Sequence, residues 1–278
     1  MSTGGGAAGD ARDRPPSPAR LPDGYRLLVL PSVTSTNDEV KRLALAGEAA
    51  GLVVNAGEQT AGRGRQRRIW TSPPGNLYLS ILLRPDCPLQ RVPEIGFVAA
   101  VAVADAVAAV LAEPARVGCK WPNDVLIDGR KVAGLLLETA TEANGGVDWA
   151  VLGIGLNIVS YPEHTGGILA ATSLVVAGAS GVRPDAMLER VVEAFARRLD
   201  DWRQGGFAPV RAAWRARAHR PGDALSVRLG FDGEILSGRF VDIDGRGALV
   251  IDTAGGRRTI AAGDCLPAPV PTTASTAG

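Results

Sequence analysis

Between Tyr25 and Trp214 the sequence switches repeatedly between the two-residue period of a β-strand and the 3.6-residue period of an α-helix. Short apolar runs predict strands over residues 25–30, 52–56, 77–83, 125–127, 131–139 and 149–157. Helical spacing of apolar residues predicts helices over 36–46, 93–111 and 184–203, and a shorter one that carries Trp214. Strands and helices that alternate in this way bury their apolar faces against each other. We therefore expect an α+β domain built on a mixed sheet.

A different pattern begins after Arg220-Pro221-Gly222. Short strands are expected over residues 225–229, 234–243, 248–252 and 257–261, separated by turns that contain glycine. This pattern predicts a small β-barrel. The 278-residue chain is thus expected to divide into a main domain, residues 24–218, and a C-terminal domain, residues 219–267. The tails, residues 1–23 and 268–278, contain few large apolar side chains and are expected to be disordered.

Composition argues against several classes of function. A formal net charge of +1 creates no overall field that would attract nucleic acid or an anionic membrane. The apolar run 97–112 is interrupted by Asp105 and is too short to span a bilayer. The N-terminal tail has neither a secretion signal nor room for a DNA-binding module. Cys87, Cys119 and Cys265 have no CxxC spacing. We expect a cytoplasmic protein that binds neither DNA nor membranes.

A loop between two of the expected strands concentrates positive charge. The basic loop, Gly62 to Trp70, places Arg63, Arg65, Arg67 and Arg68 among glycines. Glycine lets backbone amides approach a ligand closely, and arginine offers paired donors that match carboxylate or phosphate oxygens. A solvated surface loop or a nucleic-acid contact would explain the same residues about equally well.

The segment from Cys119 to Glu138 is the second candidate site. Lys120, Asn123 and Asp124 surround Trp121-Pro122, and Lys131 opens an otherwise apolar strand. Because a lysine that enters a buried strand is costly without an anion, Lys131 indicates a ligand carboxylate or phosphate. The alternatives are a lysine that extends to solvent at a strand end and an aspartate that only forms a turn.

Two further segments are ambiguous when taken singly. Ser35-Thr36-Asn37 stands at the start of the expected helix 36–46, where helix capping alone would account for it. The sequence GIGLN, Gly153 to Asn157, ends a strand with two glycines and an amide. It indicates either a close approach of the backbone to another group or a β-bulge.

Taken in chain order, these segments resemble the biotin protein ligase family. The matching pieces are STN, then QTAGRGR with a following tryptophan, then KWPND with RKVAG, then GIGLN. GRGR and KWPND with RKxAG are highly specific as a set, and the resemblance extends from about Tyr25 to Leu266. It implies a class II synthetase-like catalytic domain with a mixed sheet and an SH3-like C-terminal domain. It also implies the monofunctional type, without an N-terminal DNA-binding domain.

The resemblance implies a two-step reaction. Biotin carboxylate attacks the α-phosphorus of MgATP to give biotinyl-5′-adenylate, and a lysine of a biotin carboxyl carrier domain then attacks that anhydride. Biotin binding is thereby assigned to Ser35, Thr36, Asn37, Gln59, Gly62, Arg63, Gly64, Arg65, Lys131 and Gly134. ATP binding is assigned to Arg65, Arg68, Trp70, Lys120, Asn123, Asp124, Lys131 and Asn157. Catalytic roles fall to Lys131, Arg65 and Asp124, and Mg²⁺ is expected to enter with the ATP phosphates rather than in a protein site of its own.

The sequence departs from a common family version, GRGRRGRxW, at Gln66-Arg67, where that version has Arg-Gly. Residues 159–172 lack a periodic pattern and are expected to form a mobile loop that closes over adenine. The rival functions are lipoate ligation on the same fold, a repressor that senses biotinyl-adenylate, and an inactive binding module. We expect a monomer or a weak homodimer.

Overall fold

The computed structural model describes residues 19–142, 145–163, 169–230 and 233–266. Its larger sheet has seven strands in the order β1-β2-β3-β7-β6-β5-β4. Their bounds are β1 Arg26–Val33, β2 Leu52–Gln59, β3 Leu77–Leu83, β4 Val117–Lys120, β5 Asp124–Ile127, β6 Arg130–Thr141 and β7 Val147–Leu156. β1 and β2 are parallel, and every other neighbouring pair is antiparallel. The expected mixed sheet is confirmed.

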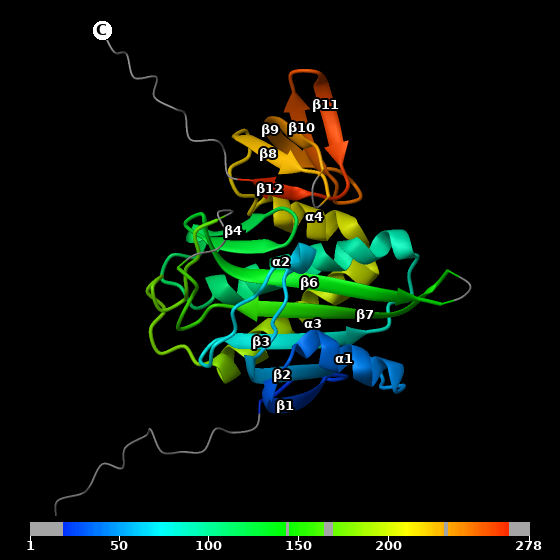
Figure 1. Ribbon diagram of the computed structural model, residues 1–278, viewed down its shortest axis with the longest axis vertical. Coiled ribbons are helices and arrows are strands. Elements are labelled where there is room, and N and C mark those ends of the chain that lie inside the picture. The colour runs from blue at the N-terminus through cyan, green and yellow to red at the C-terminus, as the bar shows by residue number, and fades with distance from the viewer. Residues whose placement is uncertain (1–18, 143–144, 164–168, 231–232, 267–278) are drawn as a thin grey trace, which may run out of the picture.

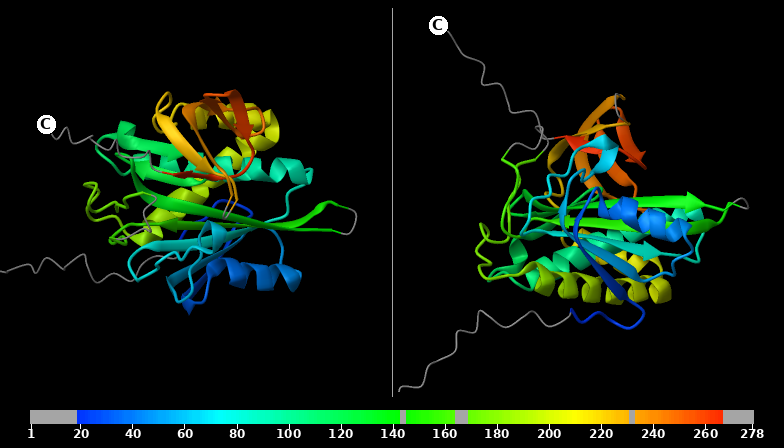
Figure 2. Two further views of the ribbon diagram at one scale, coloured as in Figure 1. Left: turned by 45° about the horizontal axis from the view of Figure 1, so that its top comes forward. Right: turned by 60° about the horizontal axis from the view of Figure 1, so that its bottom comes forward.

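Alternate residues of the strands supply two apolar layers, one on each face of this sheet. Val53 of β2 joins the main core under helices α2 (Val92–Ala108) and α3 (Pro184–Gly205). Its neighbours Leu52 and Val54 face the opposite side and pack with helix α1 (Thr36–Leu45). In Figures 1 and 2, α2 and α3 lie behind the sheet and α1 lies in front of the β1–β3 half. α1 also packs on the start of β7, through Trp149 and Val151, so the part of this face that no helix covers is the end of β7 and the neighbouring start of β6.

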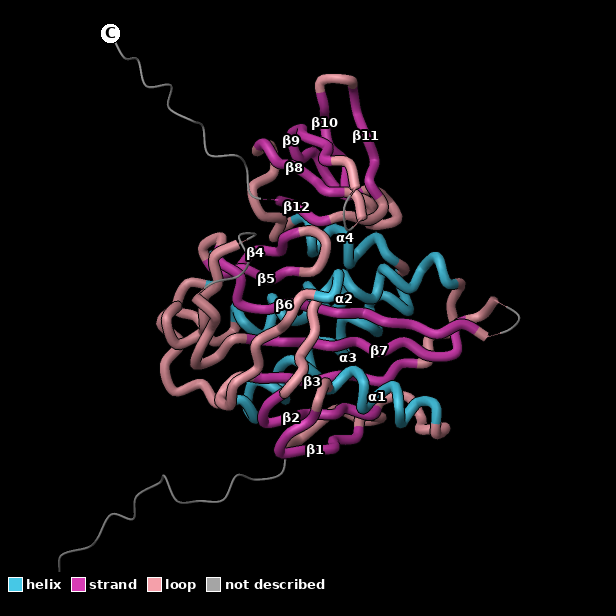
Figure 3. Tube along the Cα trace, in the orientation of Figure 1, coloured by secondary structure: helices cyan, strands magenta, loops and turns pink. Residues whose placement is uncertain are grey.

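The second sheet forms the C-terminal domain. Its strands are β8 Ala224–Arg228, β9 Ile235–Ile243, β10 Leu249–Thr253, β11 Gly256–Ile260 and β12 Asp264–Leu266. They are antiparallel in the order β11-β10-β9-β8-β12. The domain rests on α4 (Phe207–Arg215) and the β4 edge of the larger sheet, as Figure 3 shows. This arrangement agrees with the expected small C-terminal barrel.

Aromatic rings join the two sheets. Phe97 of α2 packs edge-on against Phe207 and Trp214 of α4, and Trp214 packs against Phe240 of β9 at 6.4 Å between ring centroids. Trp121 Nε1 donates a hydrogen bond to the carbonyl of Gly247 at 3.0 Å. These rings and the Trp121–Gly247 bond are buried, so the barrel is packed onto the larger domain rather than tethered to it.

The expected strands and helices are confirmed within a few residues at each end, with two omissions. The short strands β4 and β12 were not expected, and α2 ends at Ala108 rather than at residue 111. The predicted Asp128-Gly129 turn joins β5 to β6, with φ of 50° and 75° at its two residues. The predicted disordered tails are residues 1–23 and 268–278, of which 1–18 and 268–278 lie outside the described residues. In the described part of the N-terminal tail, Leu21 packs against the core and the Arg20 amide donates to Glu189 Oε1 at 2.7 Å.

Candidate active site

The uncovered part of β6 and β7 has a floor without side chains. The glycine floor consists of Gly134 on β6 and Gly153 and Gly155 on β7, and Gly134 pairs directly with Gly155 across the strands. A β-carbon at Gly155 would lie 2.5 Å from the Trp70 indole, and one at Gly153 would lie 2.2 Å from Asn37 Oδ1. The β6–β7 register is regular here. GIGLN thus provides a close approach of backbone to side chains, and the alternative of a β-bulge is wrong.

A network of polar side chains lies at one end of the glycine floor, where α1 begins. The Thr36 amide and hydroxyl donate to Gln59 Oε1 at 2.9 and 3.1 Å. Ser80 Oγ lies 2.7 Å from Thr36 Oγ1 and 2.6 Å from Asn37 Oδ1. Gln59 Nε2 in turn donates to Ser72 Oγ at 2.9 Å. These donors and acceptors are nearly all buried, as a site that recognises a small polar group requires.

Helix capping does not explain the start of α1. Ser35 occupies the N-cap position and is buried, yet its hydroxyl makes no capping hydrogen bond. Glu39, three residues after Thr36 and therefore spaced for a capping box, is paired with Arg42 instead, at 2.6 Å. The capping interpretation is therefore wrong for these side chains, and Ser35 remains available to a ligand.

Glu138 closes this end of the site. Its carboxylate accepts hydrogen bonds from Asn37 at 2.7 Å and from Lys41 at 2.5 Å, and it lies 3.5 Å from the Arg63 guanidinium. Burial raises the pKa of Glu138, but the hydrogen bonds from Lys41 and Asn37 outweigh burial and leave the pKa below its ordinary value. Arg63 also pairs with Asp38 of α1. The basic loop is thus fixed to α1 at its first arginine.

Lys131 lies at the other end of the glycine floor. Its Nζ is 2.5 Å from Asp124 Oδ1 and 5.3 Å from the centre of the Trp70 ring. The Asp124 side chain is only 10% exposed, so the ammonium is held by a largely desolvated carboxylate. This position excludes the alternative that Lys131 extends to solvent, and it likewise shows Asp124 as an ion-pair partner rather than only a turn residue.

Trp70 packs against the glycine floor between these two ends. A β-carbon at Gly134 would lie 2.9 Å from its ring. The indole Nε1 is buried and has no hydrogen-bond partner among the described residues. Gly62 is equally confined, because a β-carbon there would lie 2.4 Å from the Trp70 carbonyl. Glycine is therefore required at both ends of the contact between the basic loop and the sheet.

The remaining arginines of the basic loop turn toward the C-terminal domain. Arg68 forms an ion pair with Asp264 of β12, and the Arg65 guanidinium lies 3.5 Å from the same carboxylate. Burial lowers the pKa of Arg65, although the charges of Asp264 and Asp124 act in the opposite direction. Arg65 is thus a partly buried cation between the C-terminal domain and the Lys131–Asp124 pair.

The other predicted nucleotide ligands lie near this end but already bond to the backbone. Lys120 Nζ donates to the Cys265 carbonyl at 3.0 Å, and Asn123 Nδ2 donates to the Leu135 carbonyl at 2.5 Å. Asn157 Nδ2 donates to the Thr172 carbonyl at 3.0 Å. Asn157 Oδ1, by contrast, is buried without a partner among the described residues. Lys120 has three N–H donors, so it can bind a phosphate while it keeps its bond to the Cys265 carbonyl.

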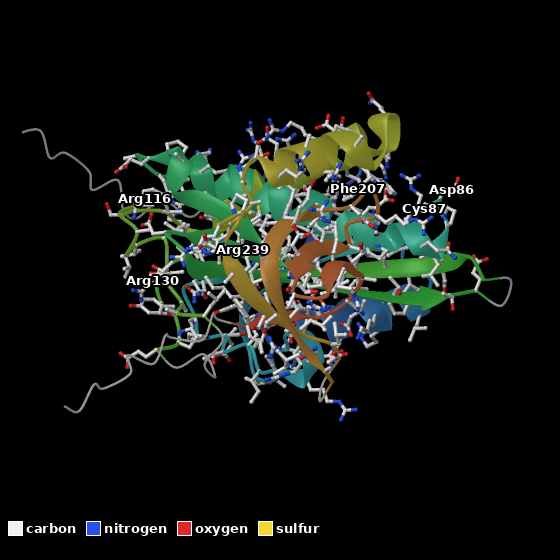
Figure 4. The ribbon with its side chains drawn as sticks, turned by 90° about the horizontal axis from the view of Figure 1, so that it is seen from above. Asp86, Cys87, Arg116, Arg130, Phe207 and Arg239 are labelled. Atoms are coloured by element: carbon white, nitrogen blue, oxygen red, sulfur yellow. The ribbon has the colours of Figure 1, made fainter. Side chains whose placement is uncertain are left out.

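The segment before α3 is held against the strand that carries Lys131. The Lys131 amide donates to the Ala170 carbonyl at 2.8 Å, and the Thr172 amide donates to the Lys131 carbonyl at 2.9 Å. Arg130 also donates to the Ala171 carbonyl, at 2.9 Å, and Figure 4 shows it at one end of the molecule. Residues 164–168 of the predicted adenine loop lie outside the described part of the chain, so its closure stays a prediction.

Several residues that the sequence analysis did not select complete the site. Ser80 had a recognisable signal, because it is the one hydroxyl in the apolar strand LYLSILL apart from its tyrosine. Glu138, Asp38 and Ser72 had none beyond their charge or polarity. Asp264 was hidden in a strand of three residues, and it meets Arg68 from 196 positions away.

The sequence matches two family models. Residues 29–157 match the biotin/lipoate A/B protein ligase family, and residues 226–266 match the biotin protein ligase C-terminal domain. Over 242 residues it is 40% identical to a biotin–[acetyl-CoA-carboxylase] ligase of Paracoccus denitrificans, covering 85% of this chain and 98% of that protein. A ligase of the same name from Mycobacterium tuberculosis is 36% identical, covering 87% and 90% of the two chains.

A solved structure agrees with these matches. The biotin protein ligase of Aquifex aeolicus, in complex with biotin and ATP, superposes with a TM-score of 0.74 at 26% identity, over 86% of this chain and 97% of that one. The matches include both sheets and the segments that form the glycine floor and the Lys131–Asp124 pair. The chain belongs to the biotin protein ligase family.

Proposed function

We propose that this protein activates biotin as biotinyl-5′-adenylate and transfers it to a lysine of a biotin carboxyl carrier domain. The observation that carries the proposal is the Lys131–Asp124 pair, at 2.5 Å, at the end of a glycine floor that the basic loop covers. Family membership supports the same reaction, as does the Aquifex aeolicus relative, whose structure holds biotin and ATP.

Adenylation brings two anions together, so the first task of the site is to offset their repulsion. Lys131 is the cation best placed to contact both the biotin carboxylate and the α-phosphate, because Asp124 and the Trp70 ring fix its Nζ beside the floor. Arg65 supplies a second cation that is partly desolvated. Charges that are fixed before the reaction begins stabilise the developing charge most effectively.

The other end of the floor suits the head group of biotin. Ser35, Thr36, Asn37 and Gln59 present hydroxyl, amide and carbonyl groups that can bind the ring of biotin beside the glycine floor. Arg63, held by Asp38 and Glu138, would keep the basic loop closed over that ring. The distance between the polar network and Lys131 is then spanned by the biotin valeryl chain.

Magnesium would enter with the ATP phosphates. Among the described residues no three His, Cys, Asp or Glu side chains gather into a metal site. Asp124 nevertheless places one carboxylate beside the phosphate-binding cations, and Mg²⁺ commonly binds through one or two carboxylates together with substrate phosphates. Bound there, the ion would neutralise phosphate charge.

In the transfer step the acceptor amine attacks the carbonyl carbon of the anhydride. The amide bond forms, AMP leaves with the bridging oxygen, and the amine gives up a proton. Asp124 is our candidate for the group that accepts this proton, because its carboxylate lies at the reacting end of the floor. Replacing it with asparagine should slow transfer from preformed biotinyl-adenylate.

Biotin is preferred over lipoate as the substrate for a specific reason. The family model for residues 29–157 covers both activities, whereas the model for residues 226–266 is specific to biotin protein ligases. The three cysteines are free thiols, as is usual for a protein in a reducing compartment. None of the described helices is long and apolar enough to cross a membrane.

The test is to incubate the protein with MgATP, a carboxyl carrier domain, and either biotin or lipoate. Mass spectrometry of the carrier should show one biotinyl group per acceptor lysine and no lipoyl group. A carrier with its acceptor lysine changed to arginine is the control and should stay unmodified. Lipoylation in preference to biotinylation, or no modification in either reaction, would contradict the proposal.

A further inference from the structure

The tip of the basic loop is a strained turn. The Arg68 amide donates to the Arg65 carbonyl at 3.2 Å, and the two residues between them, Gln66 and Arg67, have φ of 53° and 59°. Two consecutive positive φ values define a type I′ turn, which strongly favours asparagine and glycine. Neither residue here is of that kind, so the turn is unfavourable by itself and persists only if its surroundings hold it.

Three of the four side chains of this turn contact the C-terminal domain, and Arg68 also donates to Gln66 Oε1 at 3.0 Å within the turn. Gln66 Nε2 donates to the Gly230 carbonyl at 3.3 Å, and Arg65 donates to the Gly263 carbonyl at 3.3 Å. Arg68 pairs with Asp264, whose side chain is only 7% exposed, against 40% for Arg68. In Figure 1 the loop after β2 crosses in front of β7 and β6 and ends beneath β12.

We propose that Asp264 is a positioning residue that holds the basic loop in its strained turn and thereby places Arg65 and Arg68 for the nucleotide. That Arg65 and Arg68 bind a nucleotide rests on the proposed function, whereas the attachment of the basic loop to the C-terminal domain does not. Without Asp264 the turn loses its only charged anchor among the described residues. The two arginines must then be ordered when ATP binds. The free-energy cost of this ordering weakens the binding of ATP far more than that of biotin.

The first experiment measures the attachment of the loop without any substrate. Arg67 is exposed at the tip, and trypsin cuts there only when the loop opens, at a rate that follows the open population. Asp264→Asn should raise the rate of cleavage after residues 63–68 about tenfold, since a hydrogen bond between charged groups is lost. The control is Asp252→Asn, which breaks an exposed pair with Arg257 elsewhere in the C-terminal domain and should not change the rate.

The second experiment separates positioning from general damage. In adenylation assays Asp264→Asn should raise KM for ATP about tenfold and change KM for biotin far less, because Thr36, Asn37 and Gln59, which would bind the biotin ring, lie at the other end of the floor, where Asp38 holds Arg63. Asp264→Glu should recover part of the loss. Arg67→Gly in the Asp264→Asn background should also recover part of it, because glycine adopts a positive φ without strain.

The outcomes are distinct. An unchanged cleavage rate in Asp264→Asn, or an equal rise of both KM values, would overturn the proposal. If Asp264→Asn does not fold, Arg68→Gln breaks the same pair from its more exposed side and should give the same faster cleavage after residues 63–67. If the unaltered protein forms no biotinyl-adenylate, the proposed function fails, and the cleavage rates still decide whether Asp264 holds the loop.

Discussion

At the scale of single residues, the ion pair with Asp124 offsets the free-energy cost of removing the Lys131 ammonium from water. Both groups are partly or largely removed from water, at 26% and 10% exposure, and each would be unfavourable without the other. Their pairing explains how an apolar strand can begin with a lysine. It also means that Lys131 is fixed before any substrate arrives, which a solvent-exposed lysine would not be.

Lys131→Met should therefore affect activity and stability separately. Loss of one preorganised cation should slow adenylation by about 100-fold to 1000-fold. The unpaired Asp124 should lower the free energy of unfolding by about 2–3 kcal/mol. If Lys131 formed no ion pair in the unaltered protein, replacing it would lower this free energy only slightly. Activity is measured as pyrophosphate release from biotin and ATP, and stability by urea denaturation.

The double variant Asp124→Asn/Lys131→Met is the control for this prediction. It removes both charges, so most of the lost stability should return while adenylation remains slow. Recovery of adenylation in the double variant would show that Lys131 has no role beyond balancing Asp124.

At the scale of elements, periodicity predicted the sheet and the helices because the residues that face the core repeat along each segment. β4 and β12, of four and three residues, are too short to show a period. The residue types of the site were predictable for a similar reason: a lysine or a glycine pair in an apolar strand is conspicuous. Partners such as Glu138 and Asp264 were not predictable, since they reach the site through strand register and domain packing.

The glycine floor of β6 and β7 gives a prediction at this scale. Gly155→Ala would place a β-carbon 2.5 Å from the Trp70 indole, so the ring must leave the floor or the strands must separate. We expect a loss of about 1–3 kcal/mol in the free energy of unfolding, together with weaker binding of biotin by calorimetry. The additional replacement Trp70→Ala should remove most of the steric part of the loss.

Gly96→Ala is the matched control. Gly96 lies within α2, and a β-carbon there would meet no atom within 4 Å. Alanine should stabilise the helix by about 0.5–1 kcal/mol and leave biotin binding unchanged. If Gly155→Ala were as harmless as Gly96→Ala, the contact between Trp70 and the floor would not exist in solution.

At the scale of the whole molecule, several contacts couple the C-terminal domain to the larger domain. They include the buried aromatic contact between Phe97, Trp214 and Phe240, the bond from Trp121 to Gly247 and the attachment of the basic loop to β12. Aromatic pairs contribute about 0.5–1.5 kcal/mol each beyond the area that they bury. A five-stranded sheet that shares its core in this way should not unfold alone.

The cysteines report whether the two domains unfold together. Burial raises the pKa of Cys119, on β4, to about 12 and that of Cys265, on β12, to about 11, so neither thiol should react with iodoacetamide at pH 8 in the folded protein. Cys87 is half-buried, lies near the periphery beside Asp86 (Figure 4), and should be labelled first. Unfolding returns each thiol toward its ordinary pKa of about 8.5.

We predict that Cys119 and Cys265 become reactive over the same range of urea concentrations, and that this range coincides with the loss of helical circular dichroism. The reason is that each domain buries the other's aromatic side chains, so that opening either exposes both. Labelling is located by mass spectrometry of peptides. Reaction of Cys265 at distinctly lower urea than Cys119 would mean that the C-terminal domain opens independently. Phe240→Ala should produce that separation, since it removes the ring that joins β9 to α4 and so weakens the coupling without touching the active site.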